Sequence, residues 1–219
     1  MGRNKLERFR QNEINRNVIQ PGKDIFNHIK GNWNKEQFNN GQPLVVELAC
    51  GRGEFTVGLA RQYPESNFVG VDIKGSRIWK GSTIAIAEGL VNVAFLRSQI
   101  EQLDEFFAEG EIDELWITFP DPRPREGDEK KRLTSPRFLE MYQPLIKKGG
   151  IVHFKTDNTG LFNYTLEVLQ DLQETEILAY THDFYLSQYK DDHFGIQTRY
   201  EKMFSDQGEK IKYCKFRFL

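Results

Sequence analysis

The sequence predicts an α/β protein whose mostly parallel sheet is covered by helices on both faces. Between residues 44 and 180, apolar runs of strand length alternate with segments of helical periodicity. This alternation is typical of parallel strands joined by crossover helices. The end of the chain reads strand, turn, strand without a helix between, so its last strand must run antiparallel to its neighbour. We therefore expect a seven-stranded sheet with an antiparallel C-terminal strand.

The elements follow one another in a regular order. Strands are expected at 44–49, 67–71, 92–96, 114–119, 151–155 and 175–180, and helices at 54–63, 76–88, 100–107, 135–147 and 158–172. Pro64 and Gly89 end two of these helices, and Pro136 stands at an early helical position where proline is tolerated. Residues 200–204 and 211–218 are expected as two strands joined by a turn, the strand after the turn being the seventh and antiparallel strand of the sheet, with the aromatic residues of this segment packed in the core.

The length of 219 residues suits one large domain with a short extension. We place the boundary at residue 40, with a basic arm and a lead-in helix at 1–40 and the main domain at 41–219. Residues 1–17 are predicted to form a flexible arm, whose basic residues are Arg3, Lys5, Arg8, Arg10 and Arg16. The arm either contacts phosphates or is a solvated tail without a partner.

Composition excludes several classes of protein. The sequence has no apolar run long enough to span a membrane and no N-terminal apolar signal region. Its two cysteines, Cys50 and Cys214, give neither a disulfide framework nor metal-ligand spacing, so we expect a cytoplasmic protein. His28, His182 and His193 lack ligand-spaced partners, so we expect no metal site, and His153 is interpreted as a core residue. The net charge of −2 does not by itself indicate whether the protein binds nucleic acid.

The stretch from residue 43 to residue 72 has the pattern of a nucleotide-type cofactor site. A strand leads into Cys50-Gly51-Arg52-Gly53, a helix follows, and the next strand ends in Asp72. Glycines after a strand let a ligand approach the backbone, and the helix N-terminus favours negative charge. An acidic residue about 20 positions further on can accept from ribose hydroxyls. The alternative is a plain βαβ unit in which the glycines only make a turn.

The second informative stretch is residues 116–138, WITFPDPRPREGDEKKRLTSPRF. Pro120 and Pro122 fix the backbone and hold Asp121 at the tip of a strand. A mixed, largely basic loop follows, and a basic loop beside an active face suits an anionic polymer. The alternative is a solvated loop whose acidic and basic residues pair with one another.

These motifs carry a resemblance to a known family. The order E-x-A-x-G-x-G around Glu47 resembles the first motif of class I S-adenosylmethionine (AdoMet) methyltransferases, whose fold is Rossmann-like. F-P-D-P, then H-F-K-T-D-N at 153–158 and T-R-Y-E at 198–201, resemble the bacterial tRNA (guanine-N7-)-methyltransferase family (TrmB) over about residues 43–219. The resemblance implies methyl transfer from AdoMet to guanine N7 in the variable loop of tRNA, at position 46.

Site residues are implied by the same resemblance and by the expected strand ends. Asp121 is expected between the cofactor and the target guanine as the catalytic residue. Cofactor contacts are expected at Glu47, Ala49, Gly51, Gly53, Asp72, Ile73, Ser98, Gln99 and Asp121. Substrate contacts are expected at Arg125, Asp157, Thr198, Arg199, Tyr200 and Glu201, and RNA contacts at Gly127, Asp128, Glu129, Lys130, Lys131 and Arg132.

The chain departs from the family pattern at a few positions. Arg123 replaces the usual tryptophan after F-P-D-P, Gln99 replaces an aspartate, and Ala49 replaces a first glycine. The Gln99 amide can still hydrogen-bond an adenine amino group. The alternative functions are a methyltransferase for another RNA or a small molecule, and an inactive RNA-binding relative. Monomer and homodimer are both open.

Overall fold

A computed structural model describes residues 3–192 and 194–219, so His193 lies outside the described residues. Within these ranges the chain forms one eight-stranded sheet in the order β1-β4-β3-β2-β5-β6-β8-β7. The strands are β1 Val18–Ile19, β2 Leu44–Leu48, β3 Asn67–Val71, β4 Val93–Leu96, β5 Ile112–Thr118, β6 Ile146–Thr156, β7 Thr175–Thr181 and β8 Lys212–Phe218. The strands from β1 to β6 pair in parallel, and β8 lies antiparallel to both β6 and β7.

The predicted sheet with an antiparallel C-terminal strand is therefore confirmed. The eighth strand is β1, a two-residue strand that pairs Val18 with Phe95 and Ile19 with Leu96 at the β4 edge. It escaped prediction because two residues carry no periodicity. Ile19 and the following residues Ile29, Trp33 and Phe38 are buried in the main core. The division of the chain at residue 40 stays a prediction.

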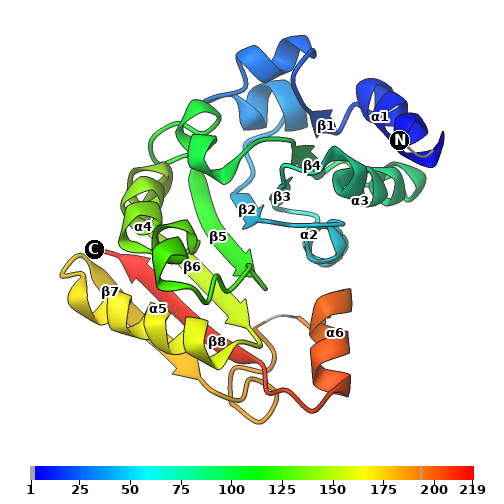
Figure 1. Cartoon of the computed structure of the whole chain (residues 1–219). Coiled ribbons are helices and arrows are strands. Elements are labelled where there is room, and N and C mark those ends of the chain that lie inside the picture. The colour runs from blue at the N-terminus through cyan, green and yellow to red at the C-terminus, as the bar shows by residue number, and fades with distance from the viewer. Residues whose placement is uncertain (1–2, 193) are drawn as a thin grey trace.

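Helices cover both faces of the sheet, as Figure 1 shows. They are α1 Arg3–Ile14, α2 Glu54–Gln62, α3 Gly75–Ala87, α4 Pro136–Tyr142, α5 Thr159–Asp171 and α6 Arg199–Asp206, with 3-10 turns at Asp24–Asn27, Ile100–Glu105, Glu126–Lys131 and Gln143–Leu145 and a π-helical turn at Trp33–Phe38. One apolar core lies between the sheet and α4 and α5, and a second lies between the sheet and α2 and α3. The alternation of strand sides supplies both cores, since Val46 and Leu48 face one and Val45 faces the other.

The predicted helix over 135–147 is too long. Helix α4 ends at Tyr142, a 3-10 turn follows, and Lys147 already belongs to β6. Pro144 provides the physical reason, because its ring removes a backbone donor and clashes with the preceding turn of a helix. The helix expected over 100–107 is likewise a 3-10 segment, Ile100–Glu105.

The strand predicted over 200–204 is wrong, because these residues lie in helix α6. Thr198 caps this helix: its side-chain oxygen accepts a hydrogen bond from the backbone N–H of Glu201 at 3.1 Å. T-x-x-E is the sequence pattern of a capping box, and it outweighs the aromatic residues that favoured a strand. Tyr200 is consequently 51% exposed and does not pack in the core as expected, whereas Tyr213 and Phe216 of β8 are buried.

The prediction of a flexible N-terminal arm is also wrong from Arg3 onward. Residues Arg3–Ile14 form α1, which packs along α3. The Asn12 side chain donates to the carbonyl of Gly75 at 2.7 Å, and the Asn15 side chain donates to the Ser82 hydroxyl at 2.8 Å. The Arg8 guanidinium lies 4.8 Å from the centre of the Trp79 ring. Tertiary contacts, rather than an apolar stripe, therefore hold this polar helix in place.

Candidate active site

Five parallel strands bring the predicted site residues to one edge of the sheet. The order β4-β3-β2-β5-β6 places the residues that follow these strands side by side at their carboxyl ends. They are Ser98–Gln99, Asp72, Ala49–Gly53, Pro120–Asp121 and Asp157. Ligands of open α/β sheets bind at this edge. The arrowheads of β5 and β6 in Figure 1 point toward α6, which carries the T-R-Y-E segment.

The glycine loop is a tight left-handed turn. Ala49, Gly51 and Gly53 have φ values of 55°, 58° and 70°. Glycine adopts left-handed backbone angles freely. At Ala49 the same angles are sterically unfavourable because of its Cβ atom, so the surrounding structure must stabilise them. At Gly53 a side chain would also collide with the ring of Phe95. The chain therefore needs glycine at 53 for close packing as well as for the turn.

Cys50 lies inside this loop and is a structural residue. Its backbone N–H donates to the Val71 carbonyl at 3.0 Å, and its side chain is buried. Burial raises the pKa of the thiol well above its usual value, so the sulfur stays protonated. Cys50 therefore has the character of a small buried residue rather than of a nucleophile.

Glu47 anchors the loop from within β2. One carboxylate oxygen accepts from the backbone N–H of Thr56 at 2.9 Å and from the Thr56 hydroxyl, and the other accepts from the Thr118 hydroxyl at 2.6 Å. The side chain is only 3% exposed. Burial raises the pKa of Glu47 to about 7, although the hydrogen bonds from Thr118 and Thr56 oppose the shift. Glu47 thus joins β2 to α2 and to β5.

Asp72 holds the same loop from β3. Its two carboxylate oxygens accept from the backbone N–H groups of Gly51 at 3.0 Å and Lys74 at 2.7 Å. Burial raises the pKa of this carboxyl group. A carboxylate oxygen has more than one acceptor site, so Asp72 can also take a ribose hydroxyl. Beside it, Ile73 is 53% exposed and offers an apolar surface at the sheet edge.

Ser98 and Gln99 follow β4 and differ in exposure. Ser98 is buried and its hydroxyl donates to the Gln99 carbonyl at 3.2 Å, whereas the Gln99 side chain is exposed. Gln99 therefore presents an exposed amide at the carboxyl edge of the sheet. An amide both donates and accepts, so it suits the edge of an adenine ring.

The F-P-D-P turn presents Asp121 to solvent at the end of β5. Phe119 and Arg123, on either side of it, have φ values of 48° and 45°. Left-handed backbone at bulky residues costs energy and is concentrated at functional sites. The Asp121 carboxylate accepts from the backbone N–H of Arg123 at 3.2 Å and pairs with the Arg123 guanidinium at 3.2 Å. Its side chain is nevertheless 63% exposed, so it is accessible to a ligand.

The basic loop after this turn forms a 3-10 segment, Glu126–Lys131, preceded by the exposed Arg125. Part of its charge is neutralised internally, because Lys131 pairs with Asp128 at 2.6 Å. Glu129 accepts from the Tyr164 hydroxyl, and the Arg132 guanidinium lies 4.3 Å from the centre of the Tyr164 ring. These contacts fix the segment on α5. Gly127 and Lys130 are exposed.

Helix α6 is tied to the sheet edge by a buried ion pair. The Lys155 ammonium of β6 donates to the Glu201 carboxylate at 2.6 Å, and both side chains are 0% exposed. The Tyr185 hydroxyl donates to the same Glu201 oxygen at 2.8 Å. At the start of the helix, the backbone N–H of Arg199 donates to the carboxylate of Glu54 on α2 at 2.6 Å. The T-R-Y-E segment therefore lies against the glycine-loop helix, with Arg199 and Tyr200 exposed.

Asp157 completes the edge at the end of β6. Its carbonyl accepts from the Lys212 ammonium at 2.5 Å, and burial raises the pKa of its carboxyl group. His153, further back in β6, is buried, is hydrogen-bonded to the Tyr213 hydroxyl at 2.7 Å and stacks on Trp116. Its interpretation as a satisfied core histidine is confirmed.

Sequence reasoning missed several residues that build the site. Lys155, Tyr185, Thr56, Thr118 and Glu54 were not singled out, although each holds a predicted site residue or its helix. One signal was present. Lys155 is a lone charge within the apolar strand I-V-H-F-K, and a buried lysine requires an anionic partner.

Among the residues that the structure describes, there is no group of three or more histidine, cysteine, aspartate or glutamate side chains arranged to hold a metal ion. No helix in the same residues has the length and apolar character needed to cross a membrane.

The fold and this carboxyl-edge site define a class I methyltransferase. The solved structure of the 16S rRNA methyltransferase KamB superposes with a TM-score of 0.64 over 84% of this chain and 91% of that chain, at 16% identity. A structure described as an antibiotic-related methyltransferase gives a TM-score of 0.63 at 19% identity, over 84% of this chain and 92% of that chain. Likeness at this level of identity concerns the fold alone.

Sequence comparison identifies the family. A family model described as "Putative methyltransferase" matches residues 41–214. A tRNA (guanine-N(7)-)-methyltransferase of Cytophaga hutchinsonii is 50% identical over 100% of this chain and 99% of the relative. One of Bacteroides fragilis is 46% identical over 99% of this chain and 86% of the relative. The chain belongs to the tRNA (guanine-N(7)-)-methyltransferase family.

Proposed function

We propose that this methyltransferase transfers a methyl group from AdoMet to N7 of a guanosine in the variable loop of tRNA, at position 46, with Asp121 as the catalytic residue. Membership of the family supports the reaction class. The observation that carries the assignment within the site is the rigid, exposed Asp121 between two left-handed residues at the carboxyl end of β5. Because tRNA is the substrate, we expect the protein to act in the cytoplasm.

The residues at the sheet edge fit AdoMet. Asp72 has acceptor capacity for ribose hydroxyls, Ile73 offers an exposed apolar surface for the adenine, and Gln99 offers an amide for the adenine edge. Gly51 and Gly53 allow close approach of the methionine part to the backbone. Glu47 serves mainly by holding Thr56 and Thr118, since both of its oxygens are engaged. When bound, AdoMet supplies an electrophilic methyl group.

The task left to the chain is positioning and charge stabilisation. Guanine N7 carries a lone pair and no proton at neutral pH, so no general base is needed. The ring gains positive charge as the methyl group is transferred, and a carboxylate beside it stabilises the transition state. Asp121 has the exposure and the position to do this, and its oxygens can also accept from the guanine N1 and N2 hydrogens. Alignment of the reacting atoms contributes the rest of the rate enhancement.

The substrate base is held, in this proposal, by Asp157, Arg125 and the T-R-Y-E segment. Arg199 and Tyr200 are exposed on α6 and can contact RNA directly. Glu201 differs, because one of its oxygens is bound by Lys155 and Tyr185. Its second oxygen is buried and has no hydrogen-bond partner among the described residues, which leaves one acceptor for a base donor. The exposed positions of the Gly127–Arg132 segment contact the RNA backbone.

Transfer of a labelled methyl group tests the proposal. Purified protein is incubated with tRNA that lacks 7-methylguanosine and with methyl-labelled AdoMet, and the product nucleosides are then separated and mapped. We expect label in 7-methylguanosine at a single variable-loop position. Label in another nucleoside or another region of the tRNA would contradict the substrate assignment. AdoMet binding without label in any RNA would contradict the reaction.

A further inference from the structure

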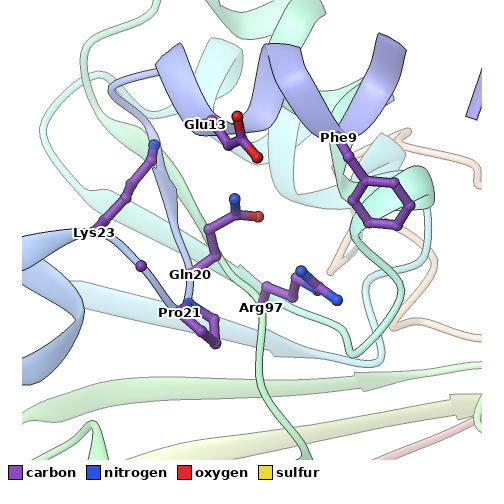
Figure 2. Close-up of a pocket in the computed structure, with 7 residues that line it drawn as sticks. Phe9, Glu13, Gln20, Pro21, Lys23 and Arg97 are labelled. Atoms are coloured by element: carbon purple, nitrogen blue, oxygen red, sulfur yellow. The ribbon is translucent and has the colours of Figure 1, made fainter. Parts of the chain in front are cut away.

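A cavity lies beneath α1 at some distance from the glycine loop. It has a volume of about 370 Å³, within the range of ~300–1,000 Å³ found for ligand pockets. Figure 2 shows its walls: Phe9 and Glu13 project from α1, Gln20 and Lys23 follow β1, and Arg97 follows β4. None of these residues belongs to the site described above. The cavity is therefore a separate feature of the fold.

The cavity opens at the same edge of the sheet as the active site. Strand β1 pairs in parallel with β4, and the backbone N–H of Arg97 donates to the Ile19 carbonyl at 2.8 Å. Gln20 and Arg97 therefore lie side by side, just after the carboxyl ends of β1 and β4. Arg97 directly precedes Ser98 in the sequence. Strand β4 lies three strands from β5 in the sheet, and neighbouring strands are about 4.8 Å apart. The β4 side of the cavity is therefore roughly 14 Å across the sheet from the F-P-D-P turn.

An unpartnered acceptor lies inside the cavity. Gln20 is only 4% exposed, and its side-chain oxygen has no hydrogen-bond partner among the described residues. Buried polar groups almost always have such a partner, so an exception calls for an explanation. Figure 2 shows the Gln20 amide projecting into the cavity toward the carboxylate of Glu13. The Gln20 amide nitrogen can donate to the Glu13 side chain, but its oxygen can only accept, so a ligand that satisfies this oxygen must bring a hydrogen-bond donor.

A flat surface and positive charge accompany this acceptor. The Arg97 guanidinium carbon lies 5.2 Å from the centre of the Phe9 ring. Aromatic rings and guanidinium planes are the surfaces on which proteins stack unpaired RNA bases. The Lys23 ammonium is fixed by the carbonyls of Asn15 and Val18 at 2.5 and 2.6 Å. Further exposed cations lie on α1 and just after it, namely Lys5, Arg10 and Arg16.

We propose that this cavity binds an unpaired, amino-bearing nucleobase of the tRNA while the target guanosine occupies the active site. The inference rests on the proposed tRNA substrate and adds a second contact to it. The base stacks on Phe9 and Arg97, and its amino group donates to the oxygens of Gln20 and Glu13. Adenine, cytosine and guanine carry such an amino group and uracil does not. The exposed cations on α1 and just after it attract the phosphates that flank the base.

The test compares Gln20→Leu with a matched control, Gln62→Leu. Leucine keeps a similar shape but removes the amide, and Gln62 is exposed in the last turn of α2. Binding of tRNA is measured in the absence of AdoMet, together with protection of each base from dimethyl sulfate and kethoxal. Loss of one neutral hydrogen bond predicts a rise of about three- to tenfold in the Kd for tRNA. We also expect one unpaired base to be protected by the wild type and the control but reactive with Gln20→Leu.

Affinity for AdoMet should be equal in all three proteins, and the melting temperature of Gln20→Leu should be equal or higher because it lacks a buried unpartnered acceptor. Unchanged tRNA affinity and an unchanged protection pattern would overturn the proposal. Weaker AdoMet binding by Gln20→Leu would also overturn it, since the cavity would then belong to the cofactor site. Phe9→Leu provides an independent second variant with the same expected protection change. All these readouts are binding measurements, so failure of methyl transfer to tRNA would be seen separately.

Discussion

The ammonium group of Lys155 lies 2.6 Å from the carboxylate of Glu201, and neither side chain is exposed. The pair joins β6 to α6 across the carboxyl edge of the sheet. On the β6 side, the Lys155 carbonyl also accepts from the backbone N–H of Phe119 at 2.9 Å, and the Lys155 ammonium lies 5.8 Å from the centre of the Phe119 ring. One lysine therefore connects the F-P-D-P turn with the T-R-Y-E helix.

Replacing one member of this pair should be far more damaging than replacing both. Lys155→Met leaves the Glu201 carboxylate buried without its cation, which costs about 3–5 kcal/mol of unfolding free energy. Lys155→Met combined with Glu201→Gln removes both charges and should recover a large part of the loss. Urea unfolding of the wild type, both single variants and the double variant measures this coupling. Additive effects of the two substitutions would show that the ion pair contributes nothing specific.

Asp121→Asn tests the catalytic assignment. The amide keeps the size of the side chain but removes the negative charge that offsets the charge developing on guanine. By analogy with the loss of one electrostatic stabiliser in other enzymes, we expect turnover to fall by about 10²–10³-fold. The Kd for AdoMet, measured by calorimetry, should stay within about twofold of the wild type, since the loss falls on the transition state.

Asp171→Asn is the matched control for Asp121→Asn, because Asp171 is exposed at the far end of α5. It should leave both turnover and AdoMet affinity unchanged. Near-normal turnover by Asp121→Asn would remove Asp121 from the mechanism. A parallel loss of AdoMet affinity would instead indicate that Asp121 binds the cofactor.

Lys130→Ala tests whether the 3-10 segment contacts RNA phosphates. Lys130 is exposed, whereas its neighbour Lys131 is already paired with Asp128. Removing one phosphate contact should weaken binding of every tRNA alike and reduce the slope of log K against log salt by about 0.7–0.9. Filter binding over a series of salt concentrations measures this slope. Lys148 is exposed near the amino end of β6, away from the carboxyl edge of the sheet, so Lys148→Ala should leave the slope unchanged. An equal effect of the two substitutions would exclude a specific contact between Lys130 and an RNA phosphate.

The sequence predicted the sheet well because its central strands are buried on both faces. Asn67–Val71 and Glu54–Gln62 were placed to within one residue, and the carboxyl-edge rule alone brought Asp72, Ser98 and Asp157 to one edge. Elements held by polar or irregular contacts were less predictable. Helix α1 has no apolar stripe, and β1 is too short to show a period.

Helix α6 shows why the site was harder to predict than the sheet. Aromatic Tyr200 and Phe204 favoured a strand, yet the cap from Thr198 and the buried Glu201 impose a helix. The T-x-x-E pattern was sufficient to predict the helix. The partner of Glu201 was not predictable, because Lys155 lies 46 positions earlier and only the folded sheet brings the two together.

Glu47 predicts a specific dependence of stability on pH. Its pKa is raised from 4.5 to about 7 in the folded protein, so between these values the native state holds a proton that the unfolded state has lost. The free energy of unfolding should therefore fall as pH rises through this window. Above pH 7 the folded protein contains the buried carboxylate in its ionised form, and its stability is lowest there. From pH 5 to pH 8, the wild type should lose about 2–3 kcal/mol of unfolding free energy relative to Glu47→Gln.

Urea unfolding of the wild type and Glu47→Gln at pH 5 and pH 8 measures this difference, and shifts that both proteins share cancel in the comparison. The exposed Glu167 on α5 provides the control, since Glu167→Gln should change stability by the same small amount at both pH values. A wild type that gains stability relative to Glu47→Gln as pH rises would mean that hydrogen bonds from Thr56 and Thr118 outweigh burial. Glu47 would then be ionised throughout and would place a fixed negative charge beneath the glycine loop.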